Sequence, residues 1–159
     1  MNIFVLDKDH ATAVKMYADS HVVKMLTEHA QIMSTVCRKH GIDAGYKSTH
    51  INHPCTIWAG RSKQNYEWLR SLSAQLNKEW QYRYNHSVNH KSYDVIASLP
   101  TPDLSDTGLT PFAQAMPEVF QSSDAVYAYR KYYKYGKKHL HKFTKRDIPS
   151  FILDNSVTF

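Results

Sequence analysis

The sequence has few cysteines and no long apolar run. These two features argue against a disulfide-rich secreted protein and against a membrane-spanning protein. Two cysteines, Cys37 and Cys55, among 159 residues are too few for a disulfide framework and are typical of a protein kept in a reducing compartment. No segment approaches the roughly 20 apolar residues of a membrane span, and residues 1–7 are too short an apolar run for a signal peptide. We therefore expect a cytoplasmic protein that has no membrane partner.

The sequence also lacks internal repeats, low-complexity segments and any alternating strand pattern beyond its first six residues. A single domain of this length buries about two thirds of its unfolded surface, so it needs neither a disulfide nor a metal for stability. We expect a compact all-α domain over residues 1–159, with two long packed helices at about 20–40 and 55–84, an N-terminal arm and a basic C-terminal helix.

Acidic residues are absent from residues 125–146, a segment that contains eight of the 20 Lys and Arg residues. The net charge of +6 therefore originates in this one block. A localised positive field usually serves an anionic partner, first a nucleic acid or a nucleotide. Tyrosines alternate with these cations, so we predict that Arg130, Tyr133 and Lys134 bind substrate through phosphate contacts and stacking. The alternatives are a block that serves only solubility and tyrosines that belong to the core.

Two stripes of side chains recur side by side at helical spacing between residues 18 and 36. The apolar stripe, which we expect to face the core, consists of Val22, Met25, Leu26, His29, Met33 and Val36. The polar row one position earlier consists of His21, Lys24, Glu28, Gln31 and Thr35. An acid and an imidazole that border the core are candidates for general acid/base chemistry, because partial burial shifts their pKa. The alternative is a solvated flank on which Lys24 and Glu28 form an i,i+4 pair.

A polar connector between residues 41 and 56 leads to the second long helix. His50, Asn52, His53 and Cys55 lie within six residues, but their spacing matches no common metal-binding motif. We therefore expect no metal and no cofactor. Pro54 suits the first position of a helix, which makes His53 its cap. A polar loop at a helix N-terminus can hold an anion or a base edge, so Asn52 and His53 are candidate substrate-binding residues.

The second long helix has one polar residue, Asn65, in its apolar stripe. The stripe consists of Ile57, Trp58, Trp68, Leu69, Leu72, Leu76 and Trp80. Asn65 has two alternative roles. Its amide either ties down a neighbouring backbone group, or it faces the same pocket as Glu28 and contacts substrate.

A short motif carries a resemblance to a known family. Residues 18–23, Ala-Asp-Ser-His-Val-Val, are followed by Glu28 seven residues after His21. This run resembles the active-site helix of the phage pyrimidine-dimer DNA glycosylases of the endonuclease V type, whose catalytic glutamate stands at that spacing. Pro54 and the Tyr-Lys tract at residues 132–137 match two further features of that family. The chain as a whole also resembles a group of uncharacterised phage proteins with His-Val-Val-Lys-Met, Asn-His-Pro-Cys and Tyr-Arg-x-Tyr-Tyr motifs.

The resemblance implies a helical fold with its N-terminal arm threaded between helices, and an enzyme that cleaves an N-glycosidic bond in DNA or a nucleotide. Glu28 and His21 are then the expected catalytic residues, with Glu28 as the acid/base group. The expected substrate-binding residues are Lys24, Gln31, Asn52, His53, Asn65, Arg130, Tyr133 and Lys134. If a phage encodes the chain, its location is the host cytoplasm. The sequence leaves open whether the protein is a homo-oligomer.

The chain departs from that family at two points. The family attacks the sugar C1′ with the α-amine of a small residue exposed by removal of the initiator Met, whereas this chain begins Met1-Asn2. The family's arginines on the key helix are replaced by Thr27 and Gln31. Glu28 could still activate water for simple hydrolysis. Two alternatives follow: a non-catalytic nucleotide-binding phage protein that sequesters a host immune signalling nucleotide, and a nucleic-acid-binding accessory protein that uses only its basic tail.

Overall fold

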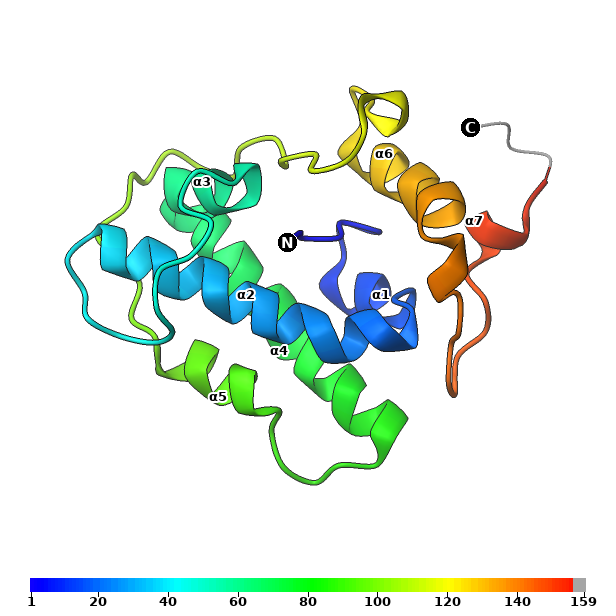
Figure 1. Cartoon of the computed structure of the whole chain (residues 1–159), viewed down its shortest axis with the longest axis horizontal. Helices are drawn as coiled ribbons and strands as arrows, with labels where there is room; N and C mark the ends of the chain where they lie inside the picture. The colour runs from blue at the N-terminus through cyan, green and yellow to red at the C-terminus, as the bar shows by residue number, and fades with distance from the viewer. Residues whose placement is uncertain (156–159) are drawn as a thin grey trace.

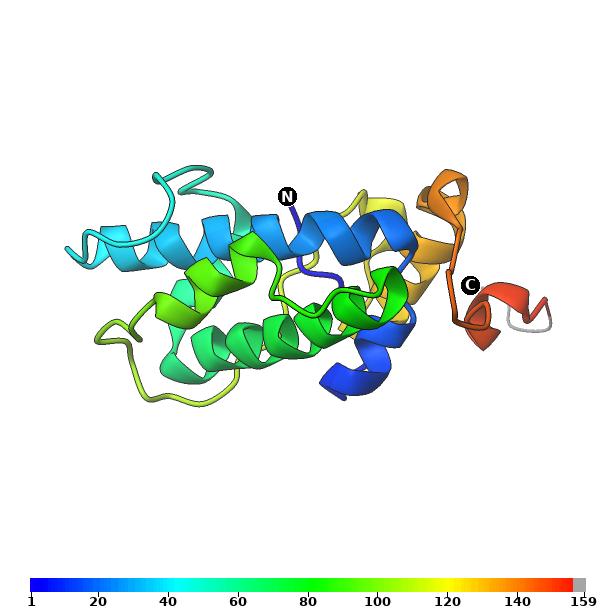
Figure 2. The ribbon, with the colours of Figure 1, turned by 90° about the horizontal axis from the view of Figure 1, so that it is seen from below.

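Two long helices, α2 (Asp19–Lys39) and α4 (Lys63–Tyr84), lie side by side along the computed structural model (Figure 1, Figure 2). The structure describes residues 1–155, and within this range every regular element is helical. α1 (His10–Lys15) packs on α4, α3 (Pro54–Arg61) contacts both long helices, and α5 (Lys91–Ser98) packs mainly on α2. The predicted all-α class with two long packed helices is therefore confirmed.

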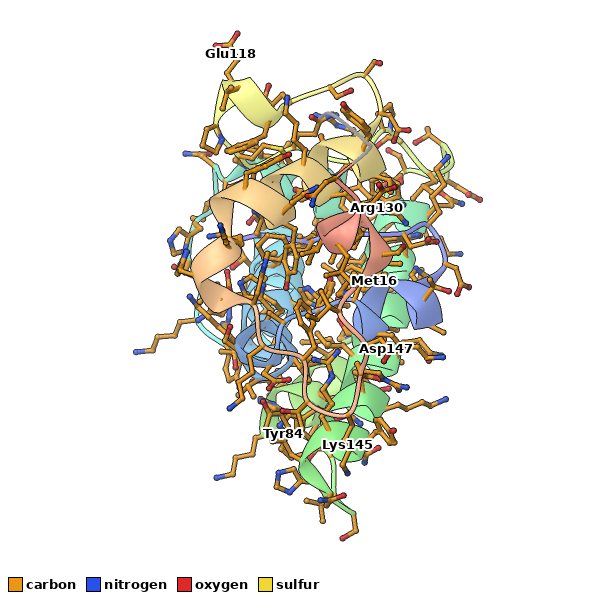
Figure 3. All side chains as sticks on the ribbon, turned by 90° about the vertical axis from the view of Figure 1, so that its right-hand side faces the viewer. Met16, Tyr84, Glu118, Arg130, Lys145 and Asp147 are labelled. Atoms are coloured by element: carbon orange, nitrogen blue, oxygen red, sulfur yellow. The ribbon has the colours of Figure 1, made fainter. Side chains whose placement is uncertain are left out.

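The C-terminal part of the chain consists of short elements. They are η1 (Glu118–Phe120), α6 (Ala125–Lys131), the π-turn η2 (Tyr132–Gly136), η3 (Lys138–Leu140) and α7 (Ser150–Leu153). Between η3 and α7 the chain reaches the end of α4, where the Lys145 ammonium donates a hydrogen bond to the Tyr82 carbonyl at 2.8 Å (Figure 3). The predicted basic C-terminal helix exists as α6 together with η2.

The helix predicted over residues 55–84 is in fact two helices, because the chain breaks at Ser62. Ser62 has extended backbone angles (φ −148°, ψ 158°), and its hydroxyl accepts a hydrogen bond from the Asn65 amide at 3.0 Å. Serine commonly caps a helix in this way. Periodicity missed the break because the apolar residues keep helical spacing on both sides of it.

An extended arm, residues 2–6, runs through the middle of the molecule (Figure 1). Its four apolar side chains, Ile3, Phe4, Val5 and Leu6, are 3, 2, 1 and 0 % exposed. Because the arm pairs with no strand among residues 1–155, its buried backbone groups need partners from other elements. The Tyr17 hydroxyl donates to the Phe4 carbonyl at 2.6 Å, and the Arg130 guanidinium donates to the Leu6 carbonyl at 2.7 Å. The predicted N-terminal arm is therefore part of the core.

The buried guanidinium of Arg83, 2 % exposed, joins the start of α2 to the end of α4. It donates to the Glu79 carboxylate at 2.7 Å and to the Asp19 carboxylate at 3.1 Å. Its remaining donors reach three backbone carbonyls at the end of α1 and beyond, those of Val14, Lys15 and Tyr17. All five N–H groups of the side chain are thus used. Asp19, an element of the motif at residues 18–23, is therefore a structural residue that fixes where α2 begins.

Replacing Arg83 with Lys should lower the free energy of unfolding by about 3–5 kcal/mol. A lysine ammonium has three donors and cannot reach five buried acceptors on three segments, so carboxylates and carbonyls are left without partners. Urea unfolding of the two proteins measures the difference. The matched change Arg61→Lys, at an exposed position, should cost less than about 0.5 kcal/mol. Similar small losses in both variants would contradict this role for Arg83.

Candidate functional site

The carboxylate of Glu28 and the amino group of Met1 form an ion pair, with Oε1 3.1 Å from the nitrogen. Glu28 lies in the middle of α2 and is 9 % exposed. Met1 stands at the start of the buried arm, and the N-terminus lies beside α2 on the side away from α4 (Figure 2). The alternative pairing of Glu28 with Lys24 is absent from the ion pairs of the described residues. A carboxylate and a primary amine are therefore held together by two segments far apart in sequence.

The position of Met1 is set by the side chain of Asn2, which is 7 % exposed. Its amide nitrogen donates to the Ala115 carbonyl at 2.8 Å, and its amide oxygen accepts from the Tyr129 hydroxyl at 2.8 Å. The same oxygen accepts a longer hydrogen bond, 3.7 Å, from the Cys55 thiol. Asn2 is thus anchored to three other segments, and this anchoring directs the Met1 amine towards Glu28.

His53 forms the third side of the site. As predicted, it caps α3: its Nδ1 accepts a hydrogen bond from the Cys55 amide at 3.0 Å, and Pro54 follows as the first helical residue. The neutral ring therefore carries its proton on Nε2. Burial lowers the pKa of His53, the positive charges of the Met1 amine and His50 lower it further, and Glu28 and the backbone of Met1 oppose them. The imidazole is consequently a neutral N–H donor beside the ion pair at pH 7.

Cys55 lies close to the same charges but is not a nucleophile. Burial raises the pKa of its thiol to about 11, so the sulfur stays protonated at neutral pH and lacks the thiolate that cysteine chemistry requires. Cys37 is also buried, and burial raises its pKa as well. Both cysteines are therefore structural residues.

His21 is separated from Glu28, although both belong to the polar row of α2. Seven residues of helix place the two side chains about 10 Å apart along the axis. The His21 ring is 5 % exposed, stacks on Phe4 with centroids 4.4 Å apart, and its Nδ1 is 2.7 Å from the Tyr133 hydroxyl. Burial lowers its pKa to about 4, with further lowering by Lys137, Lys24 and His139. His21 is therefore a neutral imidazole packed in the core. It lies too far from Glu28 for the two side chains to act on the same reacting group.

The remaining polar residues predicted on α2 lie within about one turn of Glu28. Lys24 is exposed one turn before Glu28, and Gln31 is half-buried about one turn after it. Asn52 is exposed in the loop that precedes His53. The structure therefore brings Glu28, Lys24 and Gln31 together along one side of α2, with His53 beside Glu28.

Asn65 belongs to a different part of the molecule and is 0 % exposed. Its amide nitrogen donates to the Trp58 carbonyl at 2.8 Å and to the Thr110 hydroxyl at 2.7 Å. Its amide oxygen accepts from the Thr110 amide at 2.9 Å. Of its two alternative roles, the geometry supports the structural one, because Asn65 ties the end of α3 to the loop around residue 110.

The predicted substrate-binding residues of the basic block are engaged inside the protein. Besides Leu6, Arg130 binds the Asp7 carboxylate at 3.1 Å. Tyr133 is 0 % exposed and accepts a hydrogen bond from the Ala18 amide at 2.7 Å. Lys134 is 9 % exposed and donates to the Asp154 carbonyl at 2.8 Å. These side chains therefore hold the arm, the start of α2 and the C-terminal segment together.

Sequence reasoning missed three members of the site and its surroundings. The Met1 amine carries no periodic signal, and its contact with Glu28 depends on a long-range path through the core. Lys137 and His139 reach the neighbourhood of His21 only because η2 and η3 fold back against α2. No local pattern predicts such an approach.

Comparisons of the chain with protein-family models, curated proteins and solved structures return no match. Within residues 1–155, no group of three or more His, Cys, Asp and Glu side chains is placed to hold a metal ion. None of the helices in this range is both long and apolar enough to cross a membrane. Neither the cavity of about 570 Å³ beside Trp68 nor the more open one of about 600 Å³ beside Gln121 is lined by Glu28 or His53. The site is therefore assigned from its charges and contacts, because cavity size points elsewhere.

The buried histidines of α2 should make the fold sensitive to acid. Burial lowers the pKa of His21 to about 4 and that of His29 to about 3, from an ordinary value of 6.5. Below pH 6.5 these two histidines bind protons in the unfolded chain but stay neutral in the folded protein. The free energy of unfolding should therefore fall as the pH drops towards 4. Urea unfolding measured between pH 7.5 and about 4 checks this. His21→Phe keeps the stack on Phe4 and should make the decline shallower; an unchanged decline would contradict the assignment.

Proposed function

We propose that the protein cleaves an N-glycosidic bond in DNA or in a nucleotide, with Glu28 as the acid/base group. The observation that carries the proposal is the contact of the Glu28 carboxylate with the Met1 amine at 3.1 Å. A carboxylate, an amine and a neutral imidazole N–H converge there from α2, the arm and the cap of α3. This set supplies a base, a nucleophile or its activator, and a hydrogen-bond donor for a leaving group.

Glycosidic cleavage requires the sugar to carry positive charge while the base departs with the bonding electrons. A carboxylate beside C1′ stabilises that charge electrostatically and can take a proton from an attacking water. The water oxygen then bonds to C1′, the C1′–N bond breaks, and the departing base takes up a proton. His53 would donate a hydrogen bond to the base through Nε2 once the base replaces the Met1 backbone as its partner, since its Nδ1 is occupied by the Cys55 amide.

The α-amine of Met1 offers a second route to cleavage, in which the amine itself is the nucleophile. In the glycosylase family that the α2 motif resembles, an N-terminal amine attacks C1′ directly. Here the ammonium would first lose a proton to Glu28, whose Oε1 already contacts the nitrogen. The free nitrogen would then bond to C1′ as the base leaves, and the base would take up a second N–H proton. The C1′–O4′ bond would then open, O4′ would take up the third proton, and an imine between the nitrogen and C1′ would result. Both routes use the same carboxylate.

Positive charge around the site favours an anionic substrate. Lys24 is exposed and forms no ion pair among the described residues. Lys24, Lys137 and His139 all act on the pKa of His21, so they lie near the same end of α2. In this proposal Lys24 and Lys137 take the phosphate-binding role that the sequence suggested for Arg130 and Lys134. Phosphates of DNA or of a nucleotide provide the complementary charge.

Replacing Glu28 with Gln should lower the rate of base release at least about 100-fold while changing substrate affinity only a few-fold. The glutamine amide keeps the shape of the side chain, but it cannot act as a base. It also has no negative charge with which to stabilise a positively charged sugar. Mass spectrometry of released bases, after incubation with damaged DNA and with free nucleotides, measures the rate. Glu118→Gln, at an exposed position in η1, is the matched control and should leave the rate unchanged.

Two outcomes would count against the proposal. A ligand that stays bound and intact with both proteins would assign the site to nucleotide sequestration. Equal rates for the Glu28→Gln variant and the unmodified protein would remove Glu28 from the chemistry. Circular dichroism of each variant shows that any lost rate does not come from unfolding.

A further inference from the structure

We propose a separate phosphate-binding site in the cavity at the C-terminal end of α2, which would hold a nucleotide unit of a substrate strand away from Glu28. The cavity has a volume of about 210 Å³ and lies between α2, α3 and the loop before α3. Lys39, His40 and Arg61 line it together with Thr35, Thr56 and Ile51. No acidic residue lines it. The sequence motifs gave this place no role.

The convergence of cations on this cavity is not explained by helix capping. Lys39 is the last residue of α2 and Arg61 the last of α3, and basic residues are favoured at helix C-termini because they offset the dipole. That preference accounts for one cation at each terminus, but it does not require two termini to face one cavity. Both side chains are exposed and neither makes an ion pair or hydrogen bond within residues 1–155. Their charge is therefore available for an anion.

The hydroxyl of Thr56 is a second indication. Thr56 lines the cavity and is 4 % exposed, yet its Oγ1 has no hydrogen-bond partner among the described residues. Threonine in a helix often donates to a carbonyl one turn earlier, and buried polar groups are almost always paired. Rotation of the Thr56 side chain about χ1 would bring this enclosed hydroxyl to a phosphate oxygen in the cavity, or to a water that accompanies it.

Apolar side chains at the rim favour a nucleotide unit over a free anion. Ile51 is 50 % exposed and Ile57 is 43 % exposed, and both line the same cavity as the cations. A sugar or base attached to the phosphate could pack on them and remove that apolar surface from water. Charge for a phosphate and an apolar surface for the rest of a nucleotide are thus adjacent.

The distance from Glu28 indicates which phosphate would bind. Thr35 and Lys39, which line the cavity, follow Glu28 by seven and 11 residues on α2, about 10 Å and about 16 Å along the helix axis. A phosphate at that distance belongs to a nucleotide beyond the one whose C1′ lies at Glu28. This inference rests on the proposed function for the identity of the substrate, and it makes that substrate a strand of several nucleotides.

The test compares the double variant Lys39→Gln/Arg61→Gln with the matched control Lys15→Gln/Lys78→Gln, which removes two exposed cations from α1 and α4. Binding of a fluorescent single-stranded decanucleotide is measured by anisotropy at several salt concentrations. The cavity variant should bind more weakly and lose about 0.7 units of salt slope for each phosphate contact removed.

Nuclear magnetic resonance with inorganic phosphate gives a readout independent of catalysis. The amide signals of Thr56 and Ile57 should shift on titration of the unmodified protein and of the control, but not of the cavity variant. Loss of decanucleotide and phosphate binding in the cavity variant supports the site even if no base is ever released, which would count against the proposed function alone. Equal salt slopes in both double variants, with no phosphate-dependent shift at Thr56, would overturn the inference.

Discussion

Burial of the N-terminal arm is the constraint on which the rest of the structure depends. Residues 3–6 are almost completely enclosed, so the helices around them pack on the arm as well as on one another. Apolar burial of this kind contributes roughly 1.5–3 kcal/mol for each large side chain. The enclosed backbone carbonyls of the arm also need hydrogen-bond donors, and the side chains of Tyr17 and Arg130 supply two of them. Through Asn2, the same packing places an amine against Glu28 in the middle of α2.

Much of the fold could be predicted from periodicity because its main elements are amphipathic. The apolar stripe of α2 is buried as expected, and Gly41 follows the helix with φ +77°, a conformation that suits glycine. His53 could be predicted as a cap because Pro54 follows it. The break at Ser62 could not be predicted from apolar spacing, which continues through it. The link between Asp19 and Arg83 joins residues 64 apart, and no local pattern contains it.

The candidate site was predictable in part for the same reason. Glu28 and its neighbours on α2 share one side of a helix, which spacing alone can show. The roles within the basic block could not be predicted, because composition counts cations without revealing which are already bound. Arg130 and Lys134 are engaged with Asp7 and Asp154, whereas Lys39 and Arg61, outside the block, border a cavity. Partner geometry, which depends on the whole fold, separates structural cations from those available to a ligand.

The account depends most on whether the Glu28–amine pair acts on C1′ of a sugar. The direct measurement is intact-protein and peptide mass spectrometry after incubation with damaged DNA and with nucleotides, with and without borohydride. The account predicts free base in the absence of borohydride. If the amine is the nucleophile, borohydride should also trap a sugar adduct on the peptide that begins with Met1; if water is, base should appear without an adduct. Intact substrate in every sample, with neither base nor adduct, would contradict the account.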